Sequence, residues 1–272
     1  MEGNERKTAQ GEETGAEAWQ RLSAYAYLSA PERLVVDEGQ DLPPEFYRLC
    51  RLPGARTTVF ADECQRLTDA NSTLTEIAER LGRCTSLTLD GNHRNTRQIA
   101  SFAAHFHTGT GLPVLPEREG PPPRLHRLPH GGAADLLVLL AQRHLQQSIG
   151  VIVNSTETQF SLLGSLERRA PRIRPQLYTS RARAAQNRYR TLDPGRPGIV
   201  PVHRASAKGL GFDTVVIPDT HTDTAVDPTS AALRMTYYVL ATRARRELHL
   251  AYEGETEPPL CAQVGPGDLL RG

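Results

Sequence analysis

The stretch of sequence that decides the fold is LVVDEGQD, at Leu34–Asp41. An apolar run followed at once by two adjacent carboxylates is typical of a buried strand that ends in a polar turn. Open α/β sheets bind their ligands at the carboxyl ends of parallel strands. There, Asp37 could hold Mg²⁺ on a nucleotide phosphate while Glu38 orients a water for attack. Taken alone, however, the segment is better explained as a strand that ends in a solvated acidic turn.

The same pattern returns farther along the chain. At Val59–Gln65 (VFADECQ) an apolar run again precedes acidic residues and a Gln, which can sense a terminal phosphate or hold the attacking water. Leu89–Thr96 (LDGNHRNT) places an Arg at the start of a predicted helix. Two further segments follow, His203–Asp213 (HRASAKGLGFD) and Tyr238–Arg245 (YVLATRAR). The acidic turn is therefore not an isolated feature.

Short apolar strands alternate with helices over most of the chain, with one Pro/Gly-rich interruption at 109–123. This alternation predicts an α/β fold with a largely parallel sheet. We predict strands at 34–36, 57–61, 86–89, 125–128, 150–153, 176–179, 199–203, 215–218 and 248–252, and helices at 16–28, 43–52, 74–81, 96–107, 133–146, 157–168 and 231–243.

Composition limits the function classes. The 32 Lys and Arg residues nearly balance 31 Asp and Glu residues, so the net charge is +1 and any nucleic acid must be bound in a local groove. The four cysteines form no CxxC pair, which argues against a zinc site or a disulfide framework. No apolar run approaches the ~20 residues of a membrane span. The polar first residues lack a secretory signal, so we expect a cytoplasmic protein.

Taken in order, the five segments resemble motifs II to VI of superfamily 1 helicases of the UvrD/Rep type. DEGQD is similar to the DExQD box, ADECQ to the GDxxQ segment and NHRNT to the NYRS segment. HRASAKGLGFD resembles HxxKGLEFD, and YVLATRAR resembles YVAxTRAR. One such motif is weak evidence, but five in this order, spread over residues 33–252, are far more specific.

The resemblance implies two RecA-like domains of the P-loop NTPase class, with ATP and Mg²⁺ bound between them. We expect residues 1–17 to form a disordered tail, 18–90 an incomplete first domain and 91–272 a complete second domain. Repair of DNA or defence against foreign DNA would be the setting.

The resemblance also implies roles for residues of the first domain. Asp37 would bind Mg²⁺, and Glu38 would be the general base. Gln40 would link the nucleotide site to the domain interface, and Gln65 would contact the γ-phosphate.

In the second domain, Arg94 and Arg243 would act as arginine fingers that stabilise charge on the transferring phosphoryl group. His203, Arg204 and Lys208 would lie near a single strand of nucleic acid, DNA more than RNA. Plainer explanations exist, because Arg94 could cap or pair at the surface and Arg243 could be one of several solvated charges on a helix.

The phosphate-binding loop of this family, GxxxxGK[ST], does not occur in the sequence. The only Lys-Gly pair, Lys208-Gly209, has the wrong order and lies inside another motif. That loop normally supplies most of the grip on the phosphates, so we expect negligible ATPase activity from the chain alone. Two positions also depart from the family pattern, since Gly211 stands where Glu is expected and Ala61 where Gly is expected.

Three explanations remain open: half of a split motor, a pseudo-helicase that serves as a binding or regulatory module, and a truncated gene product. We prefer a split motor whose protein partner supplies the phosphate loop. In that case the partner's strand would fill a gap between the strands predicted at 57–61 and 86–89.

Overall fold

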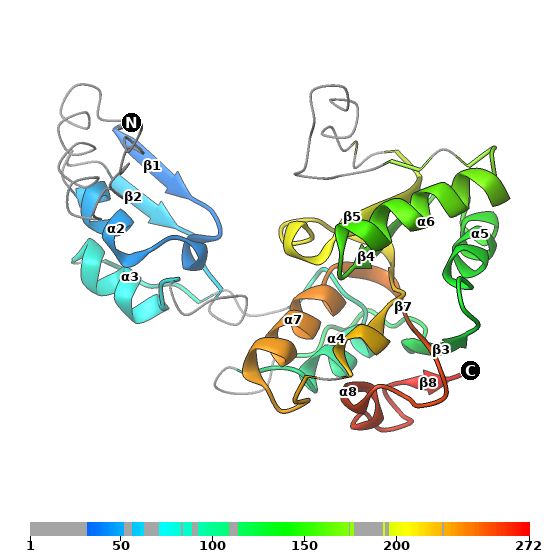
Figure 1. Cartoon of the computed structure of the whole chain (residues 1–272). Helices are drawn as coiled ribbons and strands as arrows, with labels where there is room; N and C mark the ends of the chain where they lie inside the picture. The colour runs from blue at the N-terminus through cyan, green and yellow to red at the C-terminus, as the bar shows by residue number, and fades with distance from the viewer. Residues whose placement is uncertain are drawn as a thin grey trace, which may run out of the picture. The chain divides into compact units, whose positions relative to one another are not determined.

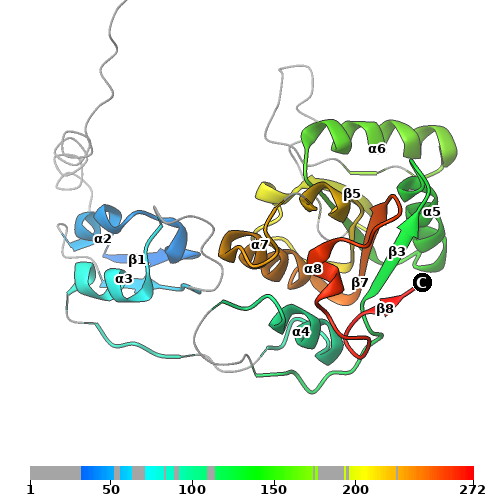
Figure 2. The same cartoon turned by 60° about the horizontal axis from the view of Figure 1, so that its bottom comes forward.

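The computed structural model describes residues 32–51, 56–62, 71–82, 84–88, 92–108, 114–173, 175–176, 193, 196–224 and 226–272 (Figure 1, Figure 2). The chain divides into two compact units between Leu87 and Thr88. The tail predicted at 1–17 and the helix predicted at 16–28 lie outside the described residues. None of the helices in the described part has the length and apolar character that crossing a bilayer requires.

The first unit contains a parallel pair of strands and two helices. Strand β1 (Arg33–Val36) pairs with β2 (Arg56–Val59), and the helices are α2 (Pro44–Arg51) and α3 (Leu74–Leu81). These four elements confirm the predictions, although β2 ends two residues early. Helix α3 begins where a capping box predicts, because Thr73 and Glu76 each accept the other's backbone N–H.

Side chains alternate along the two strands of the first unit. Val36 is buried, whereas Val35 on β1 is 67% exposed and Phe60 just after β2 is 51% exposed. The strand predicted at 86–89 is wrong over residues 86–88, which are described and form no strand. Leu87 is 85% exposed there, and within the described part no strand pairs with this segment. The gap expected between strands at 57–61 and 86–89 is therefore not present in this form.

The second unit is built on a six-stranded parallel sheet with the order β5-β4-β6-β7-β3-β8. Its predicted strands and helices are confirmed, except that residues 177–179 lie outside the described residues and Gln176 is not in a strand. The elements are β3 (Arg124–Leu128), β4 (Ser148–Val153), β5 (Gly198–His203), β6 (Phe212–Ile217), β7 (Ala244–Glu253), β8 (Leu270–Arg271), α4 (Arg97–Ala104), α5 (Ala133–Arg143), α6 (Thr156–Arg169), α7 (Ala231–Ala241) and α8 (Pro259–Ala262).

Helices cover both faces of this sheet (Figure 1, Figure 2). Helices α5 and α6 pack on one face around Leu137 and Leu166, and α4 and α7 pack on the other around Phe102 and Tyr237. Strand β4, which lies between β5 and β6, is buried along its whole length, as expected for a parallel strand between two helical layers. The loops at the two ends of the strands are thus the places where functional side chains can meet solvent.

Candidate functional site

The DEGQD turn of the first unit follows β1 directly. Asp37 is exposed, and its Oδ1 accepts the backbone N–H of Glu38 at 3.0 Å. Glu38 adopts a left-handed backbone conformation with φ 51° and ψ 42°. A non-glycine residue in this conformation is uncommon, and such residues concentrate at functional sites. The turn then continues into a short 3₁₀ helix at Gly39–Asp41.

Gln40 connects the first two motif segments. Its side chain is fully buried, its Nε2 donates to Glu38 Oε2 at 2.6 Å, and its Oε1 accepts the backbone N–H of Asp62 at 2.9 Å. One amide therefore orients the predicted general base and ties it to the end of β2. This places Gln40 as a link inside the first unit.

A buried tyrosine donates a hydrogen bond to the backbone of the same turn. Tyr47 on α2 is 0% exposed and donates its hydroxyl to the carbonyl of Gly39. Burial, followed by the nearby Cys50 and Asp41, raises the pKa of Tyr47 to about 12, so the hydroxyl stays protonated as a donor. A Cβ at Gly39 would lie 2.4 Å from Val59 Cγ1, which explains why a glycine is needed here.

The donor set at Asp37 fits a magnesium ion that is shared with nucleotide phosphates. Such an ion uses one or two protein carboxylates and takes its other ligands from water and phosphate. Asp37 Oδ2 has no partner within the described residues and is available for this role. Over the same residues, no group of three or more His, Cys, Asp or Glu is arranged to hold a metal by itself. Gln65 lies outside the described residues.

In the second unit, Asn95 joins the NHRNT and YVLATRAR segments. It is 2% exposed, and its Nδ2 donates to the carbonyls of Thr242 at 3.1 Å and Ala244 at 2.5 Å. Its Oδ1 accepts from Asn92 Nδ2 at 2.9 Å. Arg94, one residue earlier, is exposed. Asn95 therefore ties the segment that contains Arg94 to the segment that contains Arg243.

Arg243 itself is buried, with 1% of its surface exposed. Its Nε donates to Val239 O at 3.0 Å, its Nη1 to Leu210 O at 3.4 Å, and its Nη2 to Thr242 Oγ1 at 3.2 Å. The guanidinium thus fastens α7 to the loop before β6. Its predicted role as an arginine finger stays a prediction, since its donors contact protein atoms in this arrangement.

The residues predicted to contact nucleic acid follow β5. His203 ends that strand, is half-buried and accepts the backbone N–H of Ala205 at 3.1 Å. Arg204 forms a two-pronged ion pair with Asp223, with both N–O distances 3.1 Å. Lys208 is half-buried in the connection to β6. Arg204 is therefore committed to holding two turns together.

Around this ion pair lies a buried polar cluster at the carboxyl ends of β4, β5 and β6. Tyr237 donates to Asp223 Oδ2 at 2.9 Å, and its pKa is raised well above the usual value by burial and then by Asp223. Asp219 is 4% exposed and accepts the N–H of Asn154 at 2.8 Å. Burial raises the pKa of Asp219, despite that hydrogen bond. This cluster fixes the turns that carry the residues predicted to contact nucleic acid, His203, Arg204 and Lys208.

The predicted residues of the second unit thus fall at two opposite ends of its parallel sheet. His203 lies at the carboxyl end of β5, whereas Arg94 and Arg243 lie beside the amino ends of β6 and β7. Asn95 and Asp223 organise these two ends, and neither was among the predicted site residues. Asn95 stands inside a motif and could have been singled out, but nothing in the segment THTD at 220–223 signals an ion-pair partner.

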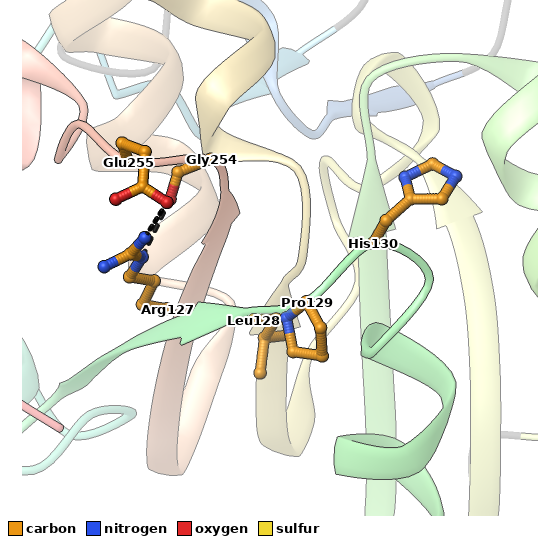
Figure 3. Close-up of a pocket in the computed structure, with 6 residues that line it drawn as sticks. All are labelled: Arg127, Leu128, Pro129, His130, Gly254 and Glu255. Atoms are coloured by element: carbon orange, nitrogen blue, oxygen red, sulfur yellow. Dashed lines mark hydrogen bonds and ion pairs between the residues drawn. The ribbon is translucent and has the colours of Figure 1, made fainter.

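A separate hollow of about 430 Å³ lies at the carboxyl ends of β3 and β7 (Figure 3). Arg127 pairs there with Glu255 and donates its Nε to Gly254 O at 2.9 Å, while His130 points away from that pair and contacts Glu253 at 2.7 Å. None of the predicted site residues lines this hollow. Its charged groups already satisfy one another, so we do not take it as the functional site.

No protein family model and no curated protein matches the chain. Among solved structures, two of S. cerevisiae Dbp5 bound to RNA and ADP BeF3, one of them a variant, match with TM-scores of 0.55 and 0.56 at 13% identity. Each match covers 94% of this chain and 63% of the Dbp5 chain. A structure described as the C-terminal domain of a possible DNA helicase from Lactobacillus plantarum matches at TM-score 0.49 and 22% identity, over 66% of this chain and 99% of that one.

The likeness to Dbp5 shows the fold. The chain is a mixed α/β protein whose six-stranded parallel sheet matches the RecA-like fold, and this confirms the predicted fold class. The chain spans less than two thirds of the Dbp5 chain that it matches. The finer resemblance to the UvrD/Rep type and the incomplete state of the first domain stay predictions.

Proposed function

We propose that this chain is a helicase-related protein of the UvrD/Rep type, the C-terminal part of an ATP-dependent motor that acts on single-stranded nucleic acid. One observation carries this proposal: the motif segments are hydrogen-bonded to one another. Gln40 bonds to Asp62, 22 positions away, and Asn95 bonds to Thr242, 147 positions away. Chance matches to short patterns give no reason for the matched segments to meet.

Within this proposal, the first unit supplies two carboxylates for phosphoryl transfer. Asp37 would hold Mg²⁺, which would neutralise charge on the phosphates when bound. Glu38 takes the proton of the attacking water, and its hydrogen bond to Gln40 keeps the carboxylate aimed. Gln65 senses the γ-phosphate, as the resemblance implies.

The motor role requires a phosphate cradle from outside these residues. Positioning and charge stabilisation dominate phosphoryl transfer, and the main phosphate cradle does not occur in these 272 residues. A partner that carries a phosphate loop would restore the cradle, with Arg94 and Arg243 acting on the transferring group.

Nucleic acid would be bound weakly, through His203 and Lys208 at the second unit. A net charge of +1 and few phosphate contacts favour a shallow dependence on salt. Dbp5 has been captured with RNA. The resemblance to the UvrD/Rep type favours DNA over RNA for this chain.

One observation favours a second candidate, an inactive pseudo-helicase that serves as a binding or regulatory module. Arg243 is buried and bonded to protein atoms through all three of its nitrogens. A structural role of this kind would persist after catalysis had been lost.

ATP turnover tests the catalytic part of the proposal. The purified chain with Mg²⁺, ATP and single-stranded DNA should show background turnover, and Glu38→Gln should change nothing. Robust turnover by the chain alone that Glu38→Gln abolishes would contradict the need for a partner.

Complementation separates the motor from the pseudo-helicase. A copurifying chain that carries a phosphate loop should give ATP turnover with this protein, and Glu38→Gln in this protein should abolish it. Turnover that survives Glu38→Gln would assign catalysis to the partner alone and favour the regulatory module.

Fluorescence titration with labelled single-stranded DNA at low salt tests the nucleic-acid part. We expect His203→Ala combined with Lys208→Ala to weaken binding several-fold, and Arg127→Gln, at the end of β3, to leave it unchanged. The absence of binding by the unaltered chain would leave only a protein-interaction role.

A further inference from the structure

Arg118 lies outside the motifs and contacts the backbone of Arg94 and Arg245, beside the amino ends of β6 and β7. We call this region the arginine edge. Arg118, from the loop before β3, uses one nitrogen, Nη2, to donate to the carbonyls of both Arg94 and Arg245, the latter at 2.5 Å. Its Nε and Nη1 have no partner within the described residues. Arg118 thus fastens two arginine-bearing segments together while three of its five N–H donors stay available.

The loop that carries Arg118 is held firmly against the start of α4. The N–H of Arg97 donates to Arg118 O at 2.7 Å, and the N–H of Gly120 donates to Gln98 Oε1 at 2.8 Å. A Cβ at Gly120 would lie 2.5 Å from Thr96 Cγ2, so only glycine permits this close approach. The position of Arg118 is therefore set by backbone contacts.

Some arginines at the arginine edge pair with an acidic residue, whereas others do not. Neighbouring Arg97 pairs with Glu119 at 3.2 Å, and Arg246 pairs with Asp213 at 3.5 Å. In contrast, Arg94, Arg118 and Arg245 are exposed and form no ion pair within the part of the chain that the structure describes. The guanidinium of Arg118 lies against the backbone carbonyls of the other two arginines, and an anion bound beside it would reduce repulsion between like charges in this region.

Gly211 gives Arg245 its place. A Cβ at Gly211 would lie 3.3 Å from both Nε and Nη2 of Arg245, so the guanidinium rests directly over this glycine. The UvrD/Rep pattern expects Glu at this position. A carboxylate there would pair with Arg245, whereas glycine leaves the guanidinium unneutralised.

We infer that Arg94, Arg118 and Arg245 form an oxyanion site for a phosphate group, in which Arg118 is both a ligand and the positioning residue. The phosphate belongs either to a nucleotide or to a nucleic-acid backbone, because guanidinium groups recognise both alike. This inference deepens the proposed function by adding two arginines, Arg118 and Arg245, that the motifs do not assign to phosphate binding.

Calorimetric titration of the full chain with inorganic pyrophosphate, at low salt and without Mg²⁺, tests the site. We expect Arg118→Gln to weaken binding about 10-fold or more, as for the loss of charge-assisted hydrogen bonds. Arg118→Lys keeps the charge but not the planar fork of donors. Its affinity for pyrophosphate should therefore lie between that of the unaltered chain and that of Arg118→Gln. The control Arg127→Gln removes the same charge at the opposite end of the strands and should change affinity less than about 2-fold.

Gly211→Glu is an independent variant that leaves every hydrogen bond of Arg118 in place. It should weaken pyrophosphate binding by pairing with Arg245, even if Arg118→Gln proves to be misfolded. Competition identifies the source of the phosphate: displacement of pyrophosphate by oligo-dT indicates nucleic acid, and displacement by ATP alone indicates a nucleotide.

Failure of pyrophosphate to bind, or equal losses in Arg118→Gln, Gly211→Glu and Arg127→Gln, would overturn the inference. The proposed function is judged by partner-dependent turnover that requires Glu38, and its assigned catalytic residues include neither Arg118 nor Arg245. Each can therefore fail while the other stands.

Discussion

The two units support their motif residues in different ways. In the first, Glu38 and Asp62 are linked by the side chain of Gln40 over a two-stranded sheet whose Val35 is 67% exposed. In the second, Asn95 and Arg243 are anchored in a six-stranded sheet that is covered on both faces. A two-stranded pair gains little from burial, because stability grows with the apolar area removed from water. The first unit thus depends on polar bonds, and the second on its core.

This comparison predicts that the two units unfold separately and that the first unfolds at lower denaturant. Hydrogen-exchange mass spectrometry across a urea series reports both units in one experiment. The variants below are chosen so that each shifts one unit, and a variant that shifts both equally would break the comparison.

The largest effect should come from Asp223→Ala in the second unit. This change leaves the largely buried Arg204 side chain, 16% exposed, without its ion-pair partner and removes the acceptor of the Tyr237 hydroxyl. We expect the free energy of unfolding of the second unit to fall by about 3–5 kcal/mol, the usual cost of breaking a buried pair from one side. The urea midpoint of peptides from β4 to β7 measures it.

The double variant Arg204→Met with Asp223→Leu is the control for that loss. It removes both charges and keeps apolar volume, so it should recover much of the stability. If Asp223→Ala costs under 1 kcal/mol, the ion pair behaves as a surface pair and its assigned structural role is wrong.

Acidic pH should lower the free energy of unfolding of the second unit. Burial, then His249 and Arg124, lowers the pKa of His126 from 6.5 to about 4. The unfolded chain takes up this proton near pH 6.5, but the folded chain does so only near pH 4. Stability is therefore full above pH 6.5 and falls as the pH drops towards 4, by up to about 3 kcal/mol.

His126→Gln should remove this pH dependence, and urea midpoints at pH 7 and pH 4.5 measure the difference. The groups that face His126 include His249, whose Nδ1 lies 3.0 Å from His126 Nε2, and next to it Glu247 and His144. The pKa of Glu247 is lowered, so its own contribution is lost at still lower pH. An unchanged pH profile in His126→Gln would point to those neighbours instead.

Periodicity predicted most of the second unit because its strands are short apolar runs that are buried on both faces. β4 is the clearest case, with every residue buried. The prediction of a strand at 86–89 failed because periodicity alone is not sufficient. The alternating apolar residues match a strand, but a strand forms only where a neighbouring strand offers hydrogen bonds. That information lies in the tertiary arrangement and not in the segment.

The candidate site was predictable where motif residues themselves make the contacts. Gln40 and Asn95 lie in motif segments, and their side chains bond to further motif segments. Arg118 was beyond reach, because its role depends on carbonyls of residues 24 and 127 positions away in sequence. The burial of Arg243 could not be predicted either, because residue type alone does not show whether an arginine is exposed or buried.

A smaller effect should follow from Asn95→Ala, again in the second unit. The change leaves the carbonyls of Thr242 and Ala244 without their donor in a buried place. We expect a loss of about 2 kcal/mol, and faster exchange at 92–97. Asn154→Ala is the matched control, because that exposed amide bonds only to the Thr222 hydroxyl and should cost about 0.5 kcal/mol. Equal losses in the two variants would deny Asn95 its bridging role.

The smallest effect is the sharpest test of the comparison, because one chemical change can be made in both units. Tyr47→Phe removes the donor to Gly39 O in the first unit, and Tyr237→Phe removes the donor to Asp223 in the second. Each should cost about 1 kcal/mol, the net value of one hydrogen bond. Tyr47→Phe should lower only the first urea transition, and Tyr237→Phe only the second. A single transition that shifts alike in both variants would show that the chain folds as one cooperative body, and the contrast between a polar-bonded unit and a core-bonded unit would then fail.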